Sequence, residues 1–137
     1  ILIDCPPALG LLTVNALVAA DAVLVPLQAE FYALEGLSQL LMTVREVRQA
    51  ANPDLRLDGV VLTMYDGRNN LSQQVEADAR ATLGELVYDT VIPRNVRISE
   101  APSHGLPVIA YDPSSTGSRA YTALTDEFLA RQKDMRQ

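Results

Sequence analysis

The chain has 137 residues, which is long enough for one domain and too short for two of ordinary size. A hydrophobic fraction of 48% and a charged fraction of 20% are typical of a folded globular protein and exclude disordered and fibrous classes. The net charge of -6 argues against a protein that coats nucleic acid by bulk attraction. Any contact with DNA therefore has to rest on a few placed arginines.

The cysteine content and the lengths of the apolar runs indicate the compartment. A single cysteine, Cys5, allows no internal disulfide and no multi-cysteine metal cluster, which fits a reducing cytosol. No run approaches the roughly 18 apolar residues of a membrane span, and the start lacks the positively charged flank of a signal peptide. We expect a cytoplasmic protein with no membrane partner.

The opening stretch "ILIDCPPALG" has the pattern of a buried strand that ends at a carboxylate. Three apolar residues run into Asp4, as in a strand covered on both faces. Pro6 and Pro7 follow, and they forbid further ladder pairing. Residues 1–4 are therefore predicted to form a strand with Asp4 at its carboxyl end.

The next segments predict a short helix, a buried strand over residues 22–27 and a long helix. The long helix lies in "ALEGLSQLLMTVREVRQAANPD", where apolar residues recur at spacings of three and four. Asn52 and Pro53 end it. "LDGVVLTMYD" is then a β-branched strand, and a loop and a second amphipathic helix closed by Gly84 follow.

The last third contains a predicted strand up to Pro93, a polar segment, a short apolar piece at residues 108–111 and a final helix over about residues 118–132. Strands that alternate with helices indicate an α/β fold, with a mostly parallel sheet and helices on both faces. No segment is rich enough in Gly, Ser or Pro to act as a linker. A single domain is expected.

In such a sheet the loops that follow the strands meet at one edge, where ligands bind. The loops that qualify are Asp4 with Cys5, residues 28–30, residues 63–68 and residues 93–100. A strand-end aspartate serves equally well as a helix or turn cap and as a magnesium carboxylate of the Walker B kind. The residue pattern leaves both roles open for Asp4.

Other reactive residues favour structural roles. Cys5 has no histidine near it in sequence, so a packed or half-buried thiol is a better interpretation than a nucleophile. His104, the single histidine, lies between Ser103 and Gly105 and fits a turn. Arg68 and Arg97 each lie in a polar loop. They fit solvated surface charges first, and a phosphate-contacting patch for DNA second.

Three stretches carry a resemblance to a known family. They are "LIDCPPALGLLTVNALVAADAVLVPLQAEFYALEGL", "GVVLTMYDGRNNL" and "VIPRNVRISEAPSHGLPVIAYDPSSTGSRAY". Taken in order, they resemble the ParA/Soj chromosome-partition ATPases, of the deviant Walker A class of P-loop NTPases that also includes MinD. The resemblance covers nearly the whole chain. It implies that Asp4 is the Walker B aspartate that helps organise Mg²⁺ and that Asn15 lies in the helix after the switch loop.

The family's phosphate-binding loop has no counterpart in this sequence. Neither "GKT" nor "GKS" occurs, and the glycines are scattered. Without the N–H groups and lysine of such a loop, nothing here cradles the phosphates of ATP. The resemblance therefore implies that residues 1–137 are a single partial domain, the C-terminal half of a partition ATPase. We expect it to be inactive alone.

The resemblance also assigns roles to residues outside the phosphate site. Loops that hold the adenine of ATP in the family match Met64, Pro93, Arg94, Asn95 and Val96. Positions used for non-specific DNA binding match Arg68 and Arg97, and a region near the dimer interface matches Glu30 and Tyr32. The family mechanism implies an ATP-bound homodimer that binds DNA and a ParB-type partner that stimulates hydrolysis. The resemblance thus implies a role in chromosome or plasmid partition and an association with the nucleoid.

Two other function classes remain open. One is an interaction module that pairs with a full-length partner or a ParB-type protein and hydrolyses nothing. The other is a MinD-like membrane-associated regulator, which the acidic tail disfavours. The resemblance further implies an empty slot between the strands at residues 1–4 and 23–27. Unpaired inner strand edges would then make the isolated chain prone to aggregation.

Overall fold

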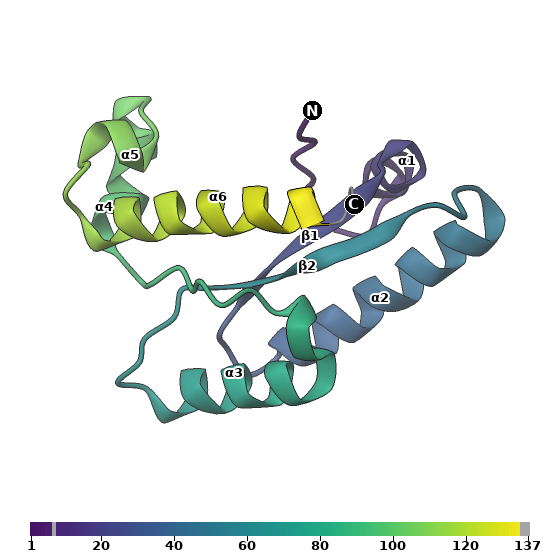
Figure 1. Cartoon of the computed structure of the whole chain (residues 1–137), viewed down its shortest axis with the longest axis horizontal. Coiled ribbons are helices and arrows are strands. Elements are labelled where there is room, and N and C mark those ends of the chain that lie inside the picture. The colour runs from purple at the N-terminus through teal and green to yellow at the C-terminus, as the bar shows by residue number, and fades with distance from the viewer. Residues whose placement is uncertain (7, 135–137) are drawn as a thin grey trace.

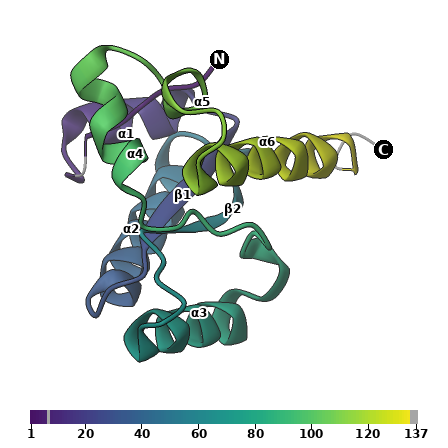
Figure 2. The same cartoon turned by 90° about the vertical axis from the view of Figure 1, so that its left-hand side faces the viewer.

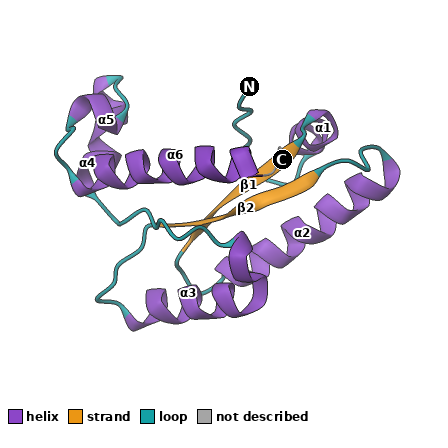
Figure 3. Ribbon diagram, in the orientation of Figure 1, coloured by secondary structure: helices purple, strands orange, loops and turns teal. Residues whose placement is uncertain are grey.

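The computed structural model describes residues 1–6 and 8–134. Helices alternate with two strands and then dominate the last third of the chain (Figure 1, Figure 3). In chain order the elements are α1 (Leu11–Ala19), β1 (Ala22–Gln28), α2 (Ala33–Ala50), β2 (Arg56–Thr63), α3 (Asn70–Leu83), the 3-10 turn η1 (Gly84–Leu86), α4 (Val96–Glu100), the 3-10 turn η2 (Ala101–His104), α5 (Val108–Tyr111) and α6 (Thr116–Asp134).

The sheet consists of β1 and β2, which pair in parallel from Ala22 opposite Arg56 to Gln28 opposite Thr63. Residues 87–93 lie beside β2 as an irregular edge segment. Two isolated parallel bridges join this segment to β2 and the loop after it, Val60 to Val87 and Tyr65 to Pro93. The predicted strand before Pro93 is thus an extended segment that pairs with its neighbour at intervals.

Helices cover both faces of the sheet, as predicted. Because side chains of a strand alternate between faces, Val60 and Leu62 pack with α2 and α3, while Val61 packs with α6. Two views at right angles show α6 on one side of the strands and α2 with α3 on the other (Figure 1, Figure 2). At the start of the strands, Leu17 of α1 packs on Val44 at the end of α2.

The chain at Leu86 and Tyr88 approaches β2 closely at Gly59. A Cβ there would lie 2.5 Å from the Tyr88 ring and 2.7 Å from the carbonyl oxygen of Leu86. Only glycine fits such a contact without moving the main chain. Tyr88 is fully buried, and its hydroxyl donates to the Asp58 carboxylate at 2.9 Å. Burial and this acceptor raise the pKa of Tyr88.

The predicted strand at residues 1–4 is wrong for this structure. Residues 1–6 have no regular secondary structure, and Ile1, Leu2, Ile3 and Asp4 are all exposed. An apolar run becomes a strand only when a neighbour supplies main-chain partners, and within the described chain β1 pairs on one edge alone, with β2. The expected slot therefore lacks one of its two flanking strands: β1 has an open edge within the described chain, and residues 1–6 run as a coil (Figure 1).

One further expectation is corrected in the last third. Arg97, predicted in a polar loop, lies in the five-residue helix α4, which Asn95 caps through a hydrogen bond from the Arg97 N–H at 2.8 Å. The apolar piece at residues 108–111, for which the sequence predicted no regular structure, is one helical turn, α5. Among residues 1–6 and 8–134, no helix is both long and apolar enough to cross a membrane.

Candidate functional site: the carboxyl edge of the sheet

Three of the predicted loops meet at the carboxyl edge of the sheet. The Ala29 N–H donates to the Thr63 carbonyl at 3.0 Å, which joins the ends of β1 and β2. The Tyr65 N–H donates to the Ile92 carbonyl at 3.1 Å, and the Arg94 N–H donates to the Tyr65 carbonyl at 2.9 Å. Main-chain hydrogen bonds therefore hold the loop that contains Met64 beside the loop that begins at Pro93.

An open hollow of about 860 Å³ lies at this edge. It brings two predicted groups together, because its walls include the base-contact candidates Met64 and Arg94 and the dimer candidates Glu30 and Tyr32. The Arg94 guanidinium lies 3.4 Å from the Glu30 carboxylate, and both side chains are more than half exposed. Such an exposed pair is weak, so both groups stay available to a ligand or partner.

Met64 has an unusual backbone conformation. Its φ of 54° makes it the only described non-glycine residue with a positive φ. Side chains other than glycine enter this left-handed region at a cost, and such positions concentrate at ligand sites. At Met64 the turn connects β2 to Tyr65, whose main chain pairs with the loop at Pro93. The sequence offered no signal for this conformation, because methionine is not a turn residue.

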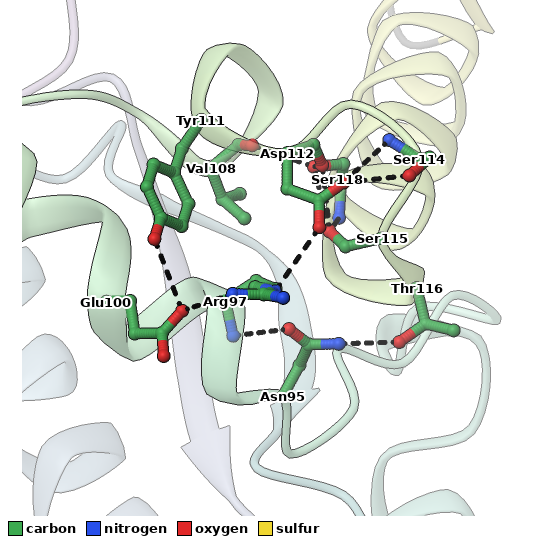
Figure 4. A network of polar contacts seen from close by, with 10 residues as sticks. All are labelled: Asn95, Arg97, Glu100, Val108, Tyr111, Asp112, Ser114, Ser115, Thr116 and Ser118. Atoms are coloured by element: carbon green, nitrogen blue, oxygen red, sulfur yellow. Dashed lines mark hydrogen bonds and ion pairs between the residues drawn. The ribbon is translucent and has the colours of Figure 1, made fainter.

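Asn95 links the start of α4 to the start of α6 (Figure 4). Its side-chain oxygen caps α4, and its amide nitrogen donates to the Thr116 hydroxyl at 2.7 Å at the start of α6. Val96, the next residue, is 70% exposed. Pro93 pairs with Tyr65 through its main chain, and the Val96 side chain lies at the surface. The oxygen and nitrogen of the Asn95 side chain both have hydrogen-bond partners within the protein.

The two DNA candidates belong to separate ion-pair groups. Arg68 lies in the loop before α3 with its side chain 92% exposed, and its guanidinium contacts both oxygens of Asp66, at 3.1 and 3.2 Å. This pairing lowers the pKa of Asp66 and raises that of Arg68. Arg97 contacts Glu100 at 2.8 Å and Asp112 at 3.4 Å, and the hydrogen bond from Arg97 to Glu100 is the largest cause of its raised pKa.

The remaining candidates lie away from the hollow. Asp4 is in the exposed N-terminal segment and Asn15 is exposed on α1. Cys5 is exposed, so the expected packed thiol is wrong; a thiol that neighbours no covering element stays in solvent. His104 ends η2 just before Gly105, which has a φ of 64°, and so the expected turn is confirmed. Within the described ranges, no three His, Cys, Asp or Glu side chains cluster as metal ligands.

Phe31 and Ser72 are among the residues of the hollow that the sequence did not single out. Phe31 is 73% exposed and meets the Tyr32 ring edge-on at 5.1 Å between centroids. Ser72, on α3, is buried and donates from its hydroxyl to the Ala29 carbonyl at 3.3 Å. The signal for Phe31 was available, because two adjacent aromatics after a strand end are unlikely to both face the core. No local signal pointed to Ser72.

The sequence of the chain is similar to a known protein family and to individual proteins. A family model described as an AAA domain (AAA_31) matches residues 1–57. The chromosome partitioning protein ParA of Caulobacter vibrioides is 61% identical over 134 residues, which are 98% of this chain and 50% of that protein. The sporulation initiation inhibitor protein Soj of Bacillus subtilis is 58% identical over 95% of this chain and 51% of its own. By sequence, the chain is similar to ParA/Soj chromosome-partition proteins over about half of their length.

The fold of the chain is similar to that of solved P-loop NTPases. Cobyrinic acid a,c-diamide synthase of Mycobacterium smegmatis superposes with a TM-score of 0.73 at 40% identity, over 95% of this chain and 46% of that one. The cell division ATPase MinD of Pyrococcus furiosus shares the fold, with a TM-score of 0.71 at 23% identity, over 96% of this chain and 50% of its own. The chain spans about half the length of the curated relatives it matches.

Proposed function

We propose that this chain provides the base-binding, dimer-forming and DNA-contacting surfaces of a partition ATPase. In this proposal the protein binds ATP and Mg²⁺, forms a homodimer and contacts DNA without sequence preference, in chromosome or plasmid partition. The observation that carries it is the pairing of Tyr65 with Pro93, which sets Met64 and Arg94 in one hollow with Glu30 and Tyr32. Support also comes from the 61% identity to a ParA protein.

The residues of the hollow fit the base end of a nucleotide. The Met64 side chain is half-buried and offers a soft apolar surface to a purine ring, and Arg94 adds N–H donors at the rim. Pro93, Asn95 and Val96 complete the loop with main-chain groups. ATP supplies the phosphoryl group that is transferred to water. The role of these residues is to hold and orient the base.

Asp4 fits a single carboxylate ligand of Mg²⁺. Magnesium takes six oxygen ligands and is often held by one or two carboxylates, with waters and phosphates in the other positions. The exposed Asp4 side chain is free to serve in that way. It forms no closed cage with other acids, since the described part of the chain has no cluster of three acidic, cysteine or histidine side chains.

The dimer and DNA roles follow from exposed side chains. Tyr32 and its neighbour Phe31 form an exposed aromatic pair beside Glu30, a composition that suits a protein interface. Arg68 and Arg97 have the guanidinium geometry that binds phosphate oxygens in pairs. A ParB-type protein is the partner proposed to stimulate hydrolysis, and association with the nucleoid follows from the DNA contacts.

The test uses the protein at its natural length. Its retention of duplex DNA is measured with ATP, with ADP and with no nucleotide, and its mass is measured under the same conditions. Binding and dimerisation that require ATP, and that Asp4→Ala abolishes, support the proposal. Binding to a ParB-type partner with no effect of nucleotide would instead favour an interaction module. The 137-residue chain alone is expected to hydrolyse no ATP. Charge neutralisation and positioning of the phosphates supply most of the catalysis, and this chain contains no phosphate-binding loop sequence to provide them.

A further inference from the structure

Arg97 is held by two carboxylates that come from different elements (Figure 4). Its guanidinium contacts Glu100, on the same helix α4, at 2.8 Å, and Asp112, just after α5, at 3.4 Å. One positive charge is thus bound by two negative charges, so the group has an excess of one negative charge. A phosphate that approaches Arg97 is therefore repelled by the excess negative charge and has to compete with two carboxylates for the guanidinium.

The fold anchors both carboxylates. Tyr111 donates from its hydroxyl to Glu100 at 3.3 Å, and the His104 ring stacks on Tyr111 at 4.8 Å between centroids. One oxygen of Asp112 accepts from the Ser114 N–H at 3.2 Å and from the Ser114 hydroxyl at 2.8 Å, while the other faces Arg97. Because these acceptors are fixed by Tyr111 on α5 and by Ser114 in the turn before α6, they are built features of the α4–α6 region.

The arginine itself remains within reach of solvent. The side chain of Arg97 is 51% exposed, against 39% for Glu100 and 28% for Asp112. Ion pairs at such exposure are weak and screened by salt. A phosphate group can therefore displace the carboxylates, but it has to compete with them.

We infer that Glu100 and Asp112 are positioning residues that hold Arg97 and lower its affinity for phosphate. The inference rests on the proposed DNA role of Arg97 and extends it: the DNA contact is made in competition with an internal ion pair, so it forms weakly and is released easily. Arg68 differs, because its one partner, Asp66, lies two residues away in the same exposed loop.

The test compares charge-neutral variants in the natural-length protein with ATP. Glu100→Gln and, separately, Asp112→Asn are expected to bind non-specific duplex DNA about three-fold more tightly than wild type, the range of a weak surface ion pair. Their affinity should also fall more steeply with salt, because Arg97 then neutralises a phosphate more fully. Glu85→Gln is the matched control, since this exposed residue of η1 lies at the opposite end of α6 and its substitution changes the net charge equally.

Double variants separate this inference from the proposed function. In an Arg97→Ala background the gain from Glu100→Gln must disappear; a gain that persists, or one that Glu85→Gln matches, overturns the inference. If Arg97→Ala weakens DNA binding and neither neutral variant tightens it, the inference fails while the DNA role stands. If Arg97→Ala leaves DNA binding unchanged, the DNA role of Arg97 fails, and the inference fails with it.

Discussion

The main-chain N–H of Tyr65 donates to the carbonyl oxygen of Ile92 at 3.1 Å, across 27 positions of the chain. This bond belongs to the bridge between Tyr65 and Pro93, and both of its partners are main-chain groups. The wall of the hollow is therefore built by the backbone. Side chains on that wall should be replaceable without loss of the fold, which allows binding and stability to be measured apart.

Met64 provides the first such test. Since glycine adopts a positive φ freely, Met64→Gly is expected to keep the free energy of unfolding within about 1 kcal/mol of wild type, while the lost side chain weakens ATP binding several-fold. Met64→Val should cost about 1–2 kcal/mol, because a β-branched residue is strained at this φ. Urea denaturation and nucleotide titration measure the two quantities. Unchanged ATP affinity in Met64→Gly would remove this residue from the base site.

The alanine variants of Arg68 and Arg97 are expected to differ in their effect on protein stability, but neither should change the DNA sequence preference. Each alanine variant should weaken binding to all duplex sequences alike and reduce the salt dependence, because phosphate contacts carry little base information. Arg97→Ala should also lower the thermal midpoint slightly, since it removes the ties from α4 to Glu100 and Asp112. Arg68→Ala should not, because its side chain is 92% exposed. Binding that changes for one duplex sequence only would contradict a phosphate contact.

The open edge of β1 predicts self-association of the isolated chain. Leu24 is 39% exposed on a strand that pairs on one edge only within the described residues, and Leu11 and Leu12 are more than 70% exposed. Unpaired edges and apolar surface promote pairing between chains, and a lysine on an edge strand opposes it. Leu24→Lys should therefore reduce the sedimenting mass of the 137-residue chain at high concentration. Leu129→Lys, on α6, is the control, and an equal effect of both would exclude the strand edge.

The sequence predicted those elements whose signal is local. The stripe of Leu37, Val44 and neighbouring residues gave α2, and Gly84 marked the end of α3. The convergence of the loops after β1 and β2 followed from the rule for parallel sheets. At residues 1–4 the same reasoning failed, because an apolar run does not reveal whether a neighbouring strand is present to pair with it.

Contacts between distant residues were not predictable. The pair of Arg94 with Glu30 spans 64 positions, and the contact of Arg97 with Asp112 depends on how α5 turns back towards α4. A single sequence does not show which distant residues come together, so Arg97 was interpreted first as a solvated surface charge. The functional roles of Arg94 and Arg97 are implied by the resemblance alone, whereas the structure shows their ion-pair partners.

Glu127 on α6 should make the stability of the protein depend on pH. Burial alone would raise the pKa of its carboxyl, but hydrogen bonds from Thr90, from the Asp89 N–H and from Arg131 outweigh burial and lower it below the ordinary 4.5. The bonds from the Thr90 and Asp89 N–H groups, at 2.8 and 2.9 Å, tie α6 to the edge segment at residues 87–93, while the bond from Arg131, at 2.7 Å, lies within α6. A carboxyl whose pKa is lower in the folded state stabilises the protein above its ordinary value, and this stabilisation is lost as pH falls through the folded value.

Glu127→Gln is accordingly expected to unfold with about 2 kcal/mol less free energy at pH 7, because an amide cannot accept from all three donors. The difference from wild type should shrink below pH 4.5, where the carboxyl of the unfolded chain becomes protonated and then that of the folded chain follows. Urea denaturation at pH 7 and at about pH 3.5 measures both differences. Asp126→Asn, an exposed neighbour on the same helix, is the control and should change neither. A difference that is the same at both pH values would show that Glu127 stabilises α6 by its shape and not by its charge.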